Sequence, residues 1–315
     1  MIYRNLGRTG LKTSILSLGT GGARRLGQST GLGIDDQKIL VAKALEHGIN
    51  TFDTASQYGN SETILGKCLT GVDRGSYILS TKWSPHNVGN TDEDLSKALE
   101  KSVTESLERL RTNHIDVMLF HGITPNIYHL VIDELYPTMA RLKEKGDVRS
   151  IGLSTKFTED PGQDAALIAL TNAPEAWDVI MLKYGILNQH AEKKILPLAR
   201  KHDVGVMNMA AVRVKLPDPY LLKNLIADWK ARGLIAHDSL PPDNPLGWLL
   251  HDNVTSIISA GYKFAAEPES ISTVLTGTAT INHLEENVEA LKYPGLPPND
   301  NQTLKDLFGH IVEYA

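Results

Sequence analysis

Residues 77–121 read YILSTKWSPHNVGNTDEDLSKALEKSVTESLERLRTNHIDVMLFH. Two short apolar runs, residues 77–82 and 115–121, enclose a segment from Leu95 to Leu110 in which apolar residues recur every three or four positions. Continuous apolar runs are typical of strands covered on both faces, and the wider spacing is typical of an amphipathic helix. Residues 91–93, TDE, would begin that helix with a capping group and acidic side chains. The stretch therefore predicts one strand–helix–strand unit.

The same pattern repeats along the chain. The apolar runs are residues 15–19, 50–55, 77–82, 115–121, 148–154, 179–184, 205–209 and 271–277. Segments of helical spacing lie between them, and Pro137 within one of these implies a kink or a late helix start. Strict alternation of strand and helix gives a parallel sheet with right-handed crossovers. Eight units predict an α/β fold, a closed (β/α)8 TIM barrel formed by residues 1–315 as one domain.

Three segments lie outside the repeat. Residues 3–13 predict a hairpin around Arg8-Thr9-Gly10 that plugs the amino-terminal end of the barrel. Residues 217–245 form a long loop inserted after the seventh strand, and residues 301–315 predict an extra carboxy-terminal helix. Insertions after barrel strands usually shape the active site.

Composition excludes several classes of function. The 32 Lys and Arg against 37 Asp and Glu give a net charge of −5, which argues against nucleic-acid binding. No run of about eighteen apolar residues predicts a membrane span, and the first residues contain no signal-peptide pattern. One cysteine fits a reducing compartment, so a cytoplasmic location is expected. The sequence contains no metal-site motif and no G-x-G-x-x-G motif of the Rossmann type. It does not decide between a monomer and a homodimer.

An acid, an amine and an imidazole stand at or near the ends of three predicted strands. These residues are Asp53, Lys82 and His121, and Tyr58 follows five residues after Asp53. Barrel chemistry takes place at the carboxyl ends of the strands, so the four side chains are expected to converge at one mouth. Burying them there costs several kcal/mol unless they are paired.

Such a cluster would adjust the pKa of the tyrosine hydroxyl. A lysine ammonium lowers the pKa of a neighbouring tyrosine from about 10, and an aspartate keeps that ammonium charged. A histidine can orient the substrate oxygen. The result is a general acid for a carbonyl, or a general base for an alcohol, and it requires a hydride donor that no side chain supplies.

The same residues lie in motifs that resemble those of the aldo-keto reductases. The motifs are residues 52–62 (FDTASQYGNSE), 80–82 (STK) and 119–121 (LFH), and residues 3–10, 16–21, 151–154 and 284–287 follow in the family's order. The resemblance implies an NAD(P)H-dependent oxidoreductase in which Tyr58 donates the proton and His121 orients the carbonyl. Lys82 and Asp53 would lower the pKa of the Tyr58 hydroxyl. Residues 261–265, GYKFA, look more like the sugar-lactol dehydrogenases of the L-galactose or D-threo-aldose type.

The cofactor site implied by the resemblance departs from the family pattern. Ser154 is kept for the nicotinamide carboxamide, but Thr155 stands where the family has asparagine and Met181 where it has glutamine. Met209 replaces the aromatic residue that stacks on the nicotinamide. A thioether packs against a ring but orients it less than an aromatic face does.

The remaining cofactor contacts leave the choice between NAD and NADP open. Arg213 and Lys215 could clamp the diphosphate, or an acidic substrate, by charge. The positions expected for a 2′-phosphate carry no permanent cation, which tilts slightly toward NAD, against the family's usual NADP. Further expected contacts are Gly19, Thr20, Asp53, Gly277, Thr278, His283, Glu286 and Asn287.

The substrate is expected to be a small carbonyl compound or a sugar, with Trp83, His86 and Tyr128 beside the tetrad. Two alternatives remain. One is a nicotinamide-binding regulatory or sensor subunit on the same fold, resembling the potassium-channel β-subunits. The other keeps Tyr58 and Lys82 for acid–base chemistry without net hydride transfer.

Overall fold

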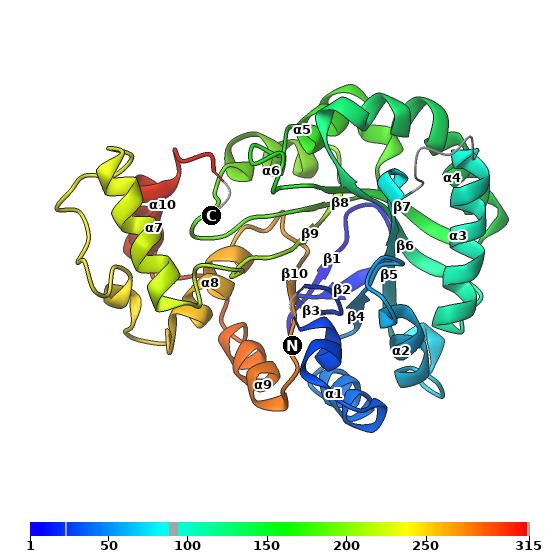
Figure 1. Ribbon diagram of the computed structural model, residues 1–315, viewed down its shortest axis with the longest axis horizontal. Helices are drawn as coiled ribbons and strands as arrows, with labels where there is room; N and C mark the ends of the chain where they lie inside the picture. Colours follow the sequence, from blue (N-terminus) through cyan, green and yellow to red (C-terminus); the bar gives the residue numbers. More distant parts are fainter. Residues whose placement is uncertain (23, 88–93, 314–315) are drawn as a thin grey trace.

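The computed structural model describes residues 1–22, 24–87 and 94–313. Within these residues, eight parallel strands close into a barrel in the order β10-β3-β4-β5-β6-β7-β8-β9 (Figure 1). They are β3 (Leu16–Gly19), β4 (Thr51–Asp53), β5 (Ile78–Trp83), β6 (Ile115–Ile123), β7 (Val148–Thr155), β8 (Val179–Leu182), β9 (Gly205–Asn208) and β10 (Thr273–Thr276). Every strand overlaps one predicted apolar run, so the predicted (β/α)8 barrel is confirmed.

Helices follow the strands and surround the barrel (Figure 1). They are α1 (Ile34–Glu46), α2 (Ser61–Cys68), α3 (Leu95–Leu110), α4 (Tyr136–Lys145), α5 (Asp164–Asn172), α6 (Ala191–Lys201), α8 (Ile257–Ala266) and α9 (Ile281–Ala290). Asp94 caps α3 by accepting hydrogen bonds from the backbone N–H groups of Ser96 and Lys97, whereas the predicted start at residues 91–93 lies outside the described residues. Pro137 falls in the first turn of α4, after a π-helical segment (Leu130–Leu135), so the helix starts late.

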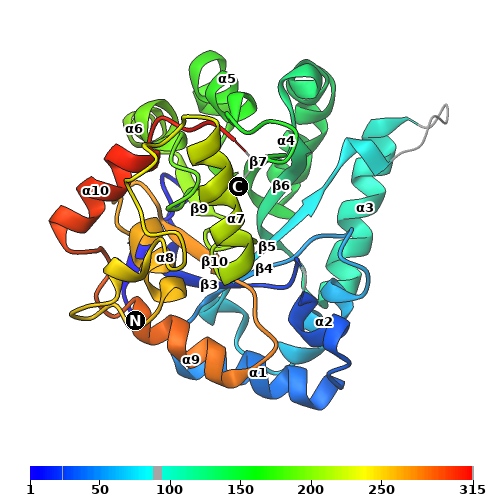
Figure 2. The ribbon, with the colours of Figure 1, turned by 60° about the vertical axis from the view of Figure 1, so that its left-hand side comes forward.

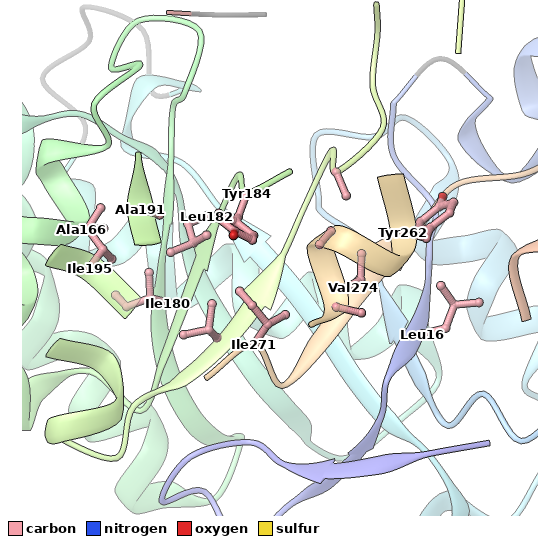
Figure 3. Close-up of a cluster of buried hydrophobic side chains, with 14 of the residues drawn as sticks. Leu16, Ala166, Ile180, Leu182, Tyr184, Ala191, Ile195, Tyr262, Ile271 and Val274 are labelled. Atoms are coloured by element: carbon pink, nitrogen blue, oxygen red, sulfur yellow. The ribbon is translucent and has the colours of Figure 1, made fainter. Parts of the chain in front are cut away.

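Alternate residues of each strand face opposite sides of the barrel wall. Inward residues such as Ile78, Leu119 and Met181 form one buried cluster inside the barrel. Outward residues form a larger cluster with the helices; Figure 3 shows part of it, with Leu182 of β8 beside Ile195 of α6. This alternation decides which side chains at the carboxyl ends of the strands can reach the mouth.

The predicted amino-terminal hairpin closes the bottom of the barrel. Strands β1 (Tyr3–Asn5) and β2 (Lys12–Ser14) pair antiparallel, and Leu6 at the turn is fully buried in the inner cluster. Gly7 has a φ of +49° and packs against the backbone at Val204, where a side chain would collide. The plug therefore fills the barrel from the end opposite the mouth.

The sequence had predicted a long loop for the insertion after β9, but part of this insertion is helical. It contains α7 (Pro219–Ala231), whose amino terminus is capped by Asp218. Trp229 of α7 packs against Phe308 of α10 (Pro298–Phe308), the additional carboxy-terminal helix, and both helices lie at the left in Figure 1. Figure 2 shows the same pair from another side. Helix α7 thus packs on another outer helix. Helix α10 begins at Pro298, three residues before the start at Asn301 that the sequence predicted.

Candidate active site

Asp53 and Lys82 form a buried ion pair at the mouth of the barrel. Lys82 Nζ donates to Asp53 Oδ1 and Oδ2 at 2.7 and 2.6 Å, and to the backbone carbonyl of Thr54 at 2.7 Å. Ser80 Oγ also donates to Asp53 Oδ1 at 2.9 Å. Burial raises the pKa of Asp53, and the ammonium of Lys82 opposes that rise. The two charges hold each other in a place where either alone would be costly.

Tyr58 lies beside this pair. Lys82 Nζ is 5.3 Å from the centre of the Tyr58 ring, and Tyr58 Oη is 3.5 Å from His121 Nε2. Gly21 packs directly on the ring, where a methyl group would collide with it. Thus the phenol, the ammonium and the imidazole converge on one point, as the strand ends predicted.

Hydrogen bonds and an ion pair at the start of α2 hold the segment that carries Tyr58. Glu62, in the first turn of α2, is buried; it accepts a hydrogen bond from Thr81 Oγ1 at 2.6 Å and pairs with Arg109 Nε at 2.7 Å. These contacts tie α2 to β5 and α3. Ser61 Oγ in turn donates to the carbonyl of Thr20 at 3.1 Å. The end of the 52–62 motif therefore holds the tyrosine loop in place.

His121 is neutral in the folded protein. Burial, then the positive charges of Lys82, His86 and Lys156, lower the pKa of His121 to about 3. A neutral imidazole has one N–H donor and one acceptor nitrogen. Its Nδ1 is buried without a hydrogen-bond partner among the described residues. His121 can therefore hydrogen-bond to a substrate oxygen without changing its charge.

This neutrality predicts a loss of stability in acid. The unfolded chain protonates His121 near pH 6.5, while the folded protein resists protonation down to about pH 3. Unfolding then takes up a proton between these values, so stability falls as the pH falls. Between pH 7 and pH 5, the wild type should lose about 2 kcal/mol more than His121→Gln. Urea unfolding at both pH values measures this, and equal losses would contradict a neutral His121.

On the cofactor side, the residues of inward register are Gly19, Ser154, Met181, Met209 and Gly277. Ser154 Oγ lies 4.0 Å from the Met209 sulfur, a long contact. A Cβ on Gly277 would lie 3.8 Å or more from the backbone of β3 and the loop after it, so this edge is open. Thr20 Oγ1, next to the tetrad, is buried without a partner in the described part of the chain. A free hydroxyl, an open glycine edge and two thioethers fit a nicotinamide dinucleotide.

Other predicted cofactor residues face away from the mouth. Thr155 has the outward register and donates to Gln163 Oε1 at 3.2 Å. Asn287 Nδ2 donates to Thr276 Oγ1 at 2.9 Å. Thr278 closes a turn with Thr280. The structure does not bring these polar groups to Ser154, because each makes its hydrogen bond within the barrel wall or within a turn. His283 and Glu286 are exposed on α9.

The predicted substrate residues are placed apart from one another. Trp83 points outward from β5 into the core between barrel and helices and is 4% exposed. Tyr128 is buried and its hydroxyl accepts from Trp177 Nε1 at 3.3 Å, in an outer aromatic cluster. His86 is exposed and lies near enough to His121 to affect its pKa. Of the three, His86 alone lies near the tetrad.

Arg213, in the loop after β9, lies next to residues of the loops after β3 and β7. A Cβ on Gly22 would lie 2.9 Å from Arg213 Nη1, and the guanidinium lies 5.7 Å from the centre of the Phe157 ring. Sequence reasoning does not assign Lys183 to the site. The signal was available, because Lys183 stands two residues after Met181 and so shares its inward register.

The described residues contain no group of three or more His, Cys, Asp or Glu placed to hold a metal ion. No helix among them is long and apolar enough to cross a membrane. Cys68 packs on the core from α2, and burial raises the pKa of its thiol to about 11.

Comparison with known proteins points the same way. A family model described as the aldo/keto reductase family matches residues 17–308. L-galactose dehydrogenase of Arabidopsis thaliana is 29% identical over 96% of this chain and 92% of that protein. A putative voltage-gated potassium channel subunit beta of Schizosaccharomyces pombe is 32% identical over 64% of this chain and 59% of that protein.

Among solved structures, aldo-keto reductase AKR11C1 from Bacillus halodurans is similar over 99% of this chain and 98% of that one, with a TM-score of 0.72 and 26% identity. The family model spans nearly all of the barrel, and the sequence motifs expected for that family are those that meet at its mouth. The chain belongs to the aldo/keto reductase family and is an oxidoreductase by its relatives.

Proposed function

We propose that the protein interconverts a carbonyl and an alcohol with a nicotinamide dinucleotide, using Tyr58 as the proton donor and acceptor. The observation that carries the proposal is the convergence of Tyr58, the buried Asp53–Lys82 pair and a neutral His121 at one point. A bound nicotinamide would supply or accept the hydride, which no side chain can do. Ser154, Met181 and Met209 would hold its ring.

The four side chains divide the work of moving the proton. In reduction, Tyr58 Oη gives its proton to the carbonyl oxygen of the substrate. The Lys82 ammonium stabilises the phenolate that results, and Asp53 keeps Lys82 charged although both side chains are buried. His121 Nε2 lies beside Tyr58 Oη, so it can hydrogen-bond to the same substrate oxygen. In oxidation the proton moves the other way.

Two observations bear on the cofactor and substrate. Gly277 and His283 stand where a 2′-phosphate would need a permanent cation, which favours NAD. A similar protein is named L-galactose dehydrogenase, so aldoses belong in the substrate screen with aldehydes and ketones. The proposed substrate is a small carbonyl compound or a sugar lactol.

The experiment is a titration of the purified protein with NADH and NADPH, followed by nicotinamide fluorescence and tryptophan quenching. Micromolar binding of one, and oxidation or reduction of it with a member of the carbonyl and aldose panel, supports the proposal. Binding of neither contradicts it. Tight binding without turnover across the panel favours a regulatory subunit, and conversion of substrate without change in nicotinamide absorbance favours acid–base chemistry alone.

Strand register gives a sharper prediction for two adjacent hydroxyls. Ser154→Ala removes a group that faces the mouth, so dinucleotide binding should weaken about tenfold, as expected for one lost hydrogen bond. Thr155→Val removes an outward group bound to Gln163, so it should lower stability by about 1 kcal/mol and leave binding within twofold. Equilibrium titration and thermal unfolding of both variants measure these effects, and the reverse assignment would refute the register argument.

A further inference from the structure

Two side-chain amides hydrogen-bond to the chain directly beyond β8. The strand ends at Leu182, and the next two residues, Lys183 and Tyr184, are buried. Gln163 Oε1 accepts from Lys183 N, and Gln163 Nε2 donates to Lys183 O, each at 2.7 Å. Asn208 Oδ1 accepts from Tyr184 N at 2.9 Å, and Asn208 Nδ2 donates to Tyr184 O at 2.8 Å. This amide pair, Gln163 and Asn208, satisfies all four backbone groups of the two residues.

The two amides approach β8 from opposite sides. Gln163 immediately precedes α5, in the segment that follows β7, and Asn208 is the last residue of β9. Strands β7 and β9 are the neighbours of β8 in the barrel. The amide pair therefore joins the carboxyl end of β8 to both neighbouring units at the mouth, where a barrel of this kind carries its chemistry.

Gln163 is buried and has a strained backbone. Its φ of +56° lies in the left-handed region, which residues other than glycine seldom adopt. Such a conformation persists where the surrounding contacts enforce it, and it is most frequent at functional sites. Gln163 Oε1 also accepts from Thr155 Oγ1 at 3.2 Å. The hydroxyl that stands at the family's asparagine position thus supports the amide pair.

The amide pair adjoins the residues proposed to hold the nicotinamide. Met181 lies on β8, and Ser154 of β7 pairs with it in register. Met209 directly follows Asn208, and its N–H donates to the carbonyl of Leu182 at 2.8 Å. A thioether is flexible and is a weak hydrogen-bond acceptor, so Met181 and Met209 orient a ring poorly by themselves. The position of the ring then depends on the backbone that carries these side chains.

We propose that Gln163 and Asn208 are positioning residues, which set the place of the nicotinamide ring through the ends of β8 and β9. The inference rests on the proposed function, because it requires a nicotinamide dinucleotide in the mouth. Without the amides, buried N–H and C=O groups of Lys183 and Tyr184 would lose their partners, and the strand ends would shift to regain them. A displacement of about 1 Å can slow a reaction between positioned groups about a hundredfold.

The test compares the dinucleotide that binds with ADP-ribose, which has the adenosine and both phosphates but lacks the nicotinamide. The 2′-phosphate of ADP-ribose takes its place if NADPH is that dinucleotide. Asn208→Leu and Gln163→Met each remove one amide with little change in size. Asn50→Leu is the matched control, because the Asn50 amide accepts from Ser14 N at 2.7 Å and donates to Lys12 O at 2.9 Å. Asn50 directly precedes β4, at the opposite end of the barrel.

The expected result separates the two ligands. Asn208→Leu and Gln163→Met should bind the dinucleotide roughly tenfold more weakly and ADP-ribose within about twofold of the wild type. Hydride transfer in a single turnover at saturating dinucleotide should slow about a hundredfold. Asn50→Leu should lose stability, since it also loses two hydrogen bonds to backbone, but should keep both affinities and the rate. A purely structural role would give all three variants this last pattern.

The inference fails if Asn208→Leu and Gln163→Met match Asn50→Leu in dinucleotide affinity and transfer rate, or if ADP-ribose affinity falls as much as dinucleotide affinity. If Asn208→Leu does not fold, the same comparison with Gln163→Met decides. Failure of the proposed function has a different result, in which the wild type binds neither NADH nor NADPH, and that result overturns both proposals.

Discussion

Tyr58→Phe is expected to lower kcat by roughly 10²–10⁴-fold, which is the usual contribution of a positioned general acid. The variant removes one oxygen from a half-buried side chain, and that oxygen lies 3.5 Å from His121 Nε2, a long contact. The ring itself still packs on Gly21. Stability should therefore stay within about 0.5 kcal/mol of the wild type. Single-turnover rates with the dinucleotide found to bind give the measurement.

The control for this variant is its affinity for that dinucleotide, which should be unchanged because Ser154, Met181 and Met209, the residues proposed to hold the nicotinamide, lie on or next to β7, β8 and β9. Loss of turnover with intact binding assigns the phenol to the chemical step. Turnover equal to that of the wild type would remove Tyr58 from the mechanism and direct attention to another acid at the mouth.

Lys82→Met should produce the largest loss of stability. Lys82 is 1% exposed and Asp53 is 2% exposed, and the substitution leaves the Asp53 carboxylate without its cation. Removing one partner of a buried pair typically costs about 3–5 kcal/mol. For a chain of this size the midpoint of thermal unfolding should fall by about 5–15 °C. Turnover should also fall, because the phenolate of Tyr58 loses its counter-charge.

The double variant Asp53→Asn/Lys82→Met separates the two roles of the pair. It removes both charges, so most of the lost stability should return while turnover stays low. Calorimetric unfolding of the wild type, both single variants and the double variant completes the cycle. Additive stability losses would show that the two side chains do not interact, contrary to the 2.6 Å contact between them.

Much of the fold follows from local pattern. Residues 179–182 are apolar on both sides because the strand is covered by other inward side chains inside the barrel and by the helices outside it. The helical segments carry their own start and stop signals, such as Gly146 after α4 in the left-handed conformation at φ +90°. The positions of Asp53, Lys82 and His121 were predictable for the same reason, since each lies at or near the carboxyl end of an apolar strand.

The errors have a common cause. Trp83 and Thr155 adjoin Lys82 and Ser154 in sequence, but a strand turns neighbouring side chains to opposite faces. Nearness to Lys82 placed Trp83 at the mouth and the family resemblance placed Thr155 there, while register places both in the wall. Counting alternate residues from Lys82 along β5, and from Ser154 along β7, gives Trp83 and Thr155 the outward facing.

Tertiary contact decided the rest. Tyr128 is buried against Trp177, a partner 49 residues away, and Arg213 lies next to Gly22, which comes far earlier in the chain. No spacing rule links such pairs, because their meeting depends on how the barrel closes. The strands, the order of units and the strand-end positions of Asp53, Lys82 and His121 follow from the sequence by itself, since each depends on local periodicity or on the end of one strand. The tertiary structure alone decided the neutral state of His121, because burial and through-space charge act between groups that the chain keeps far apart.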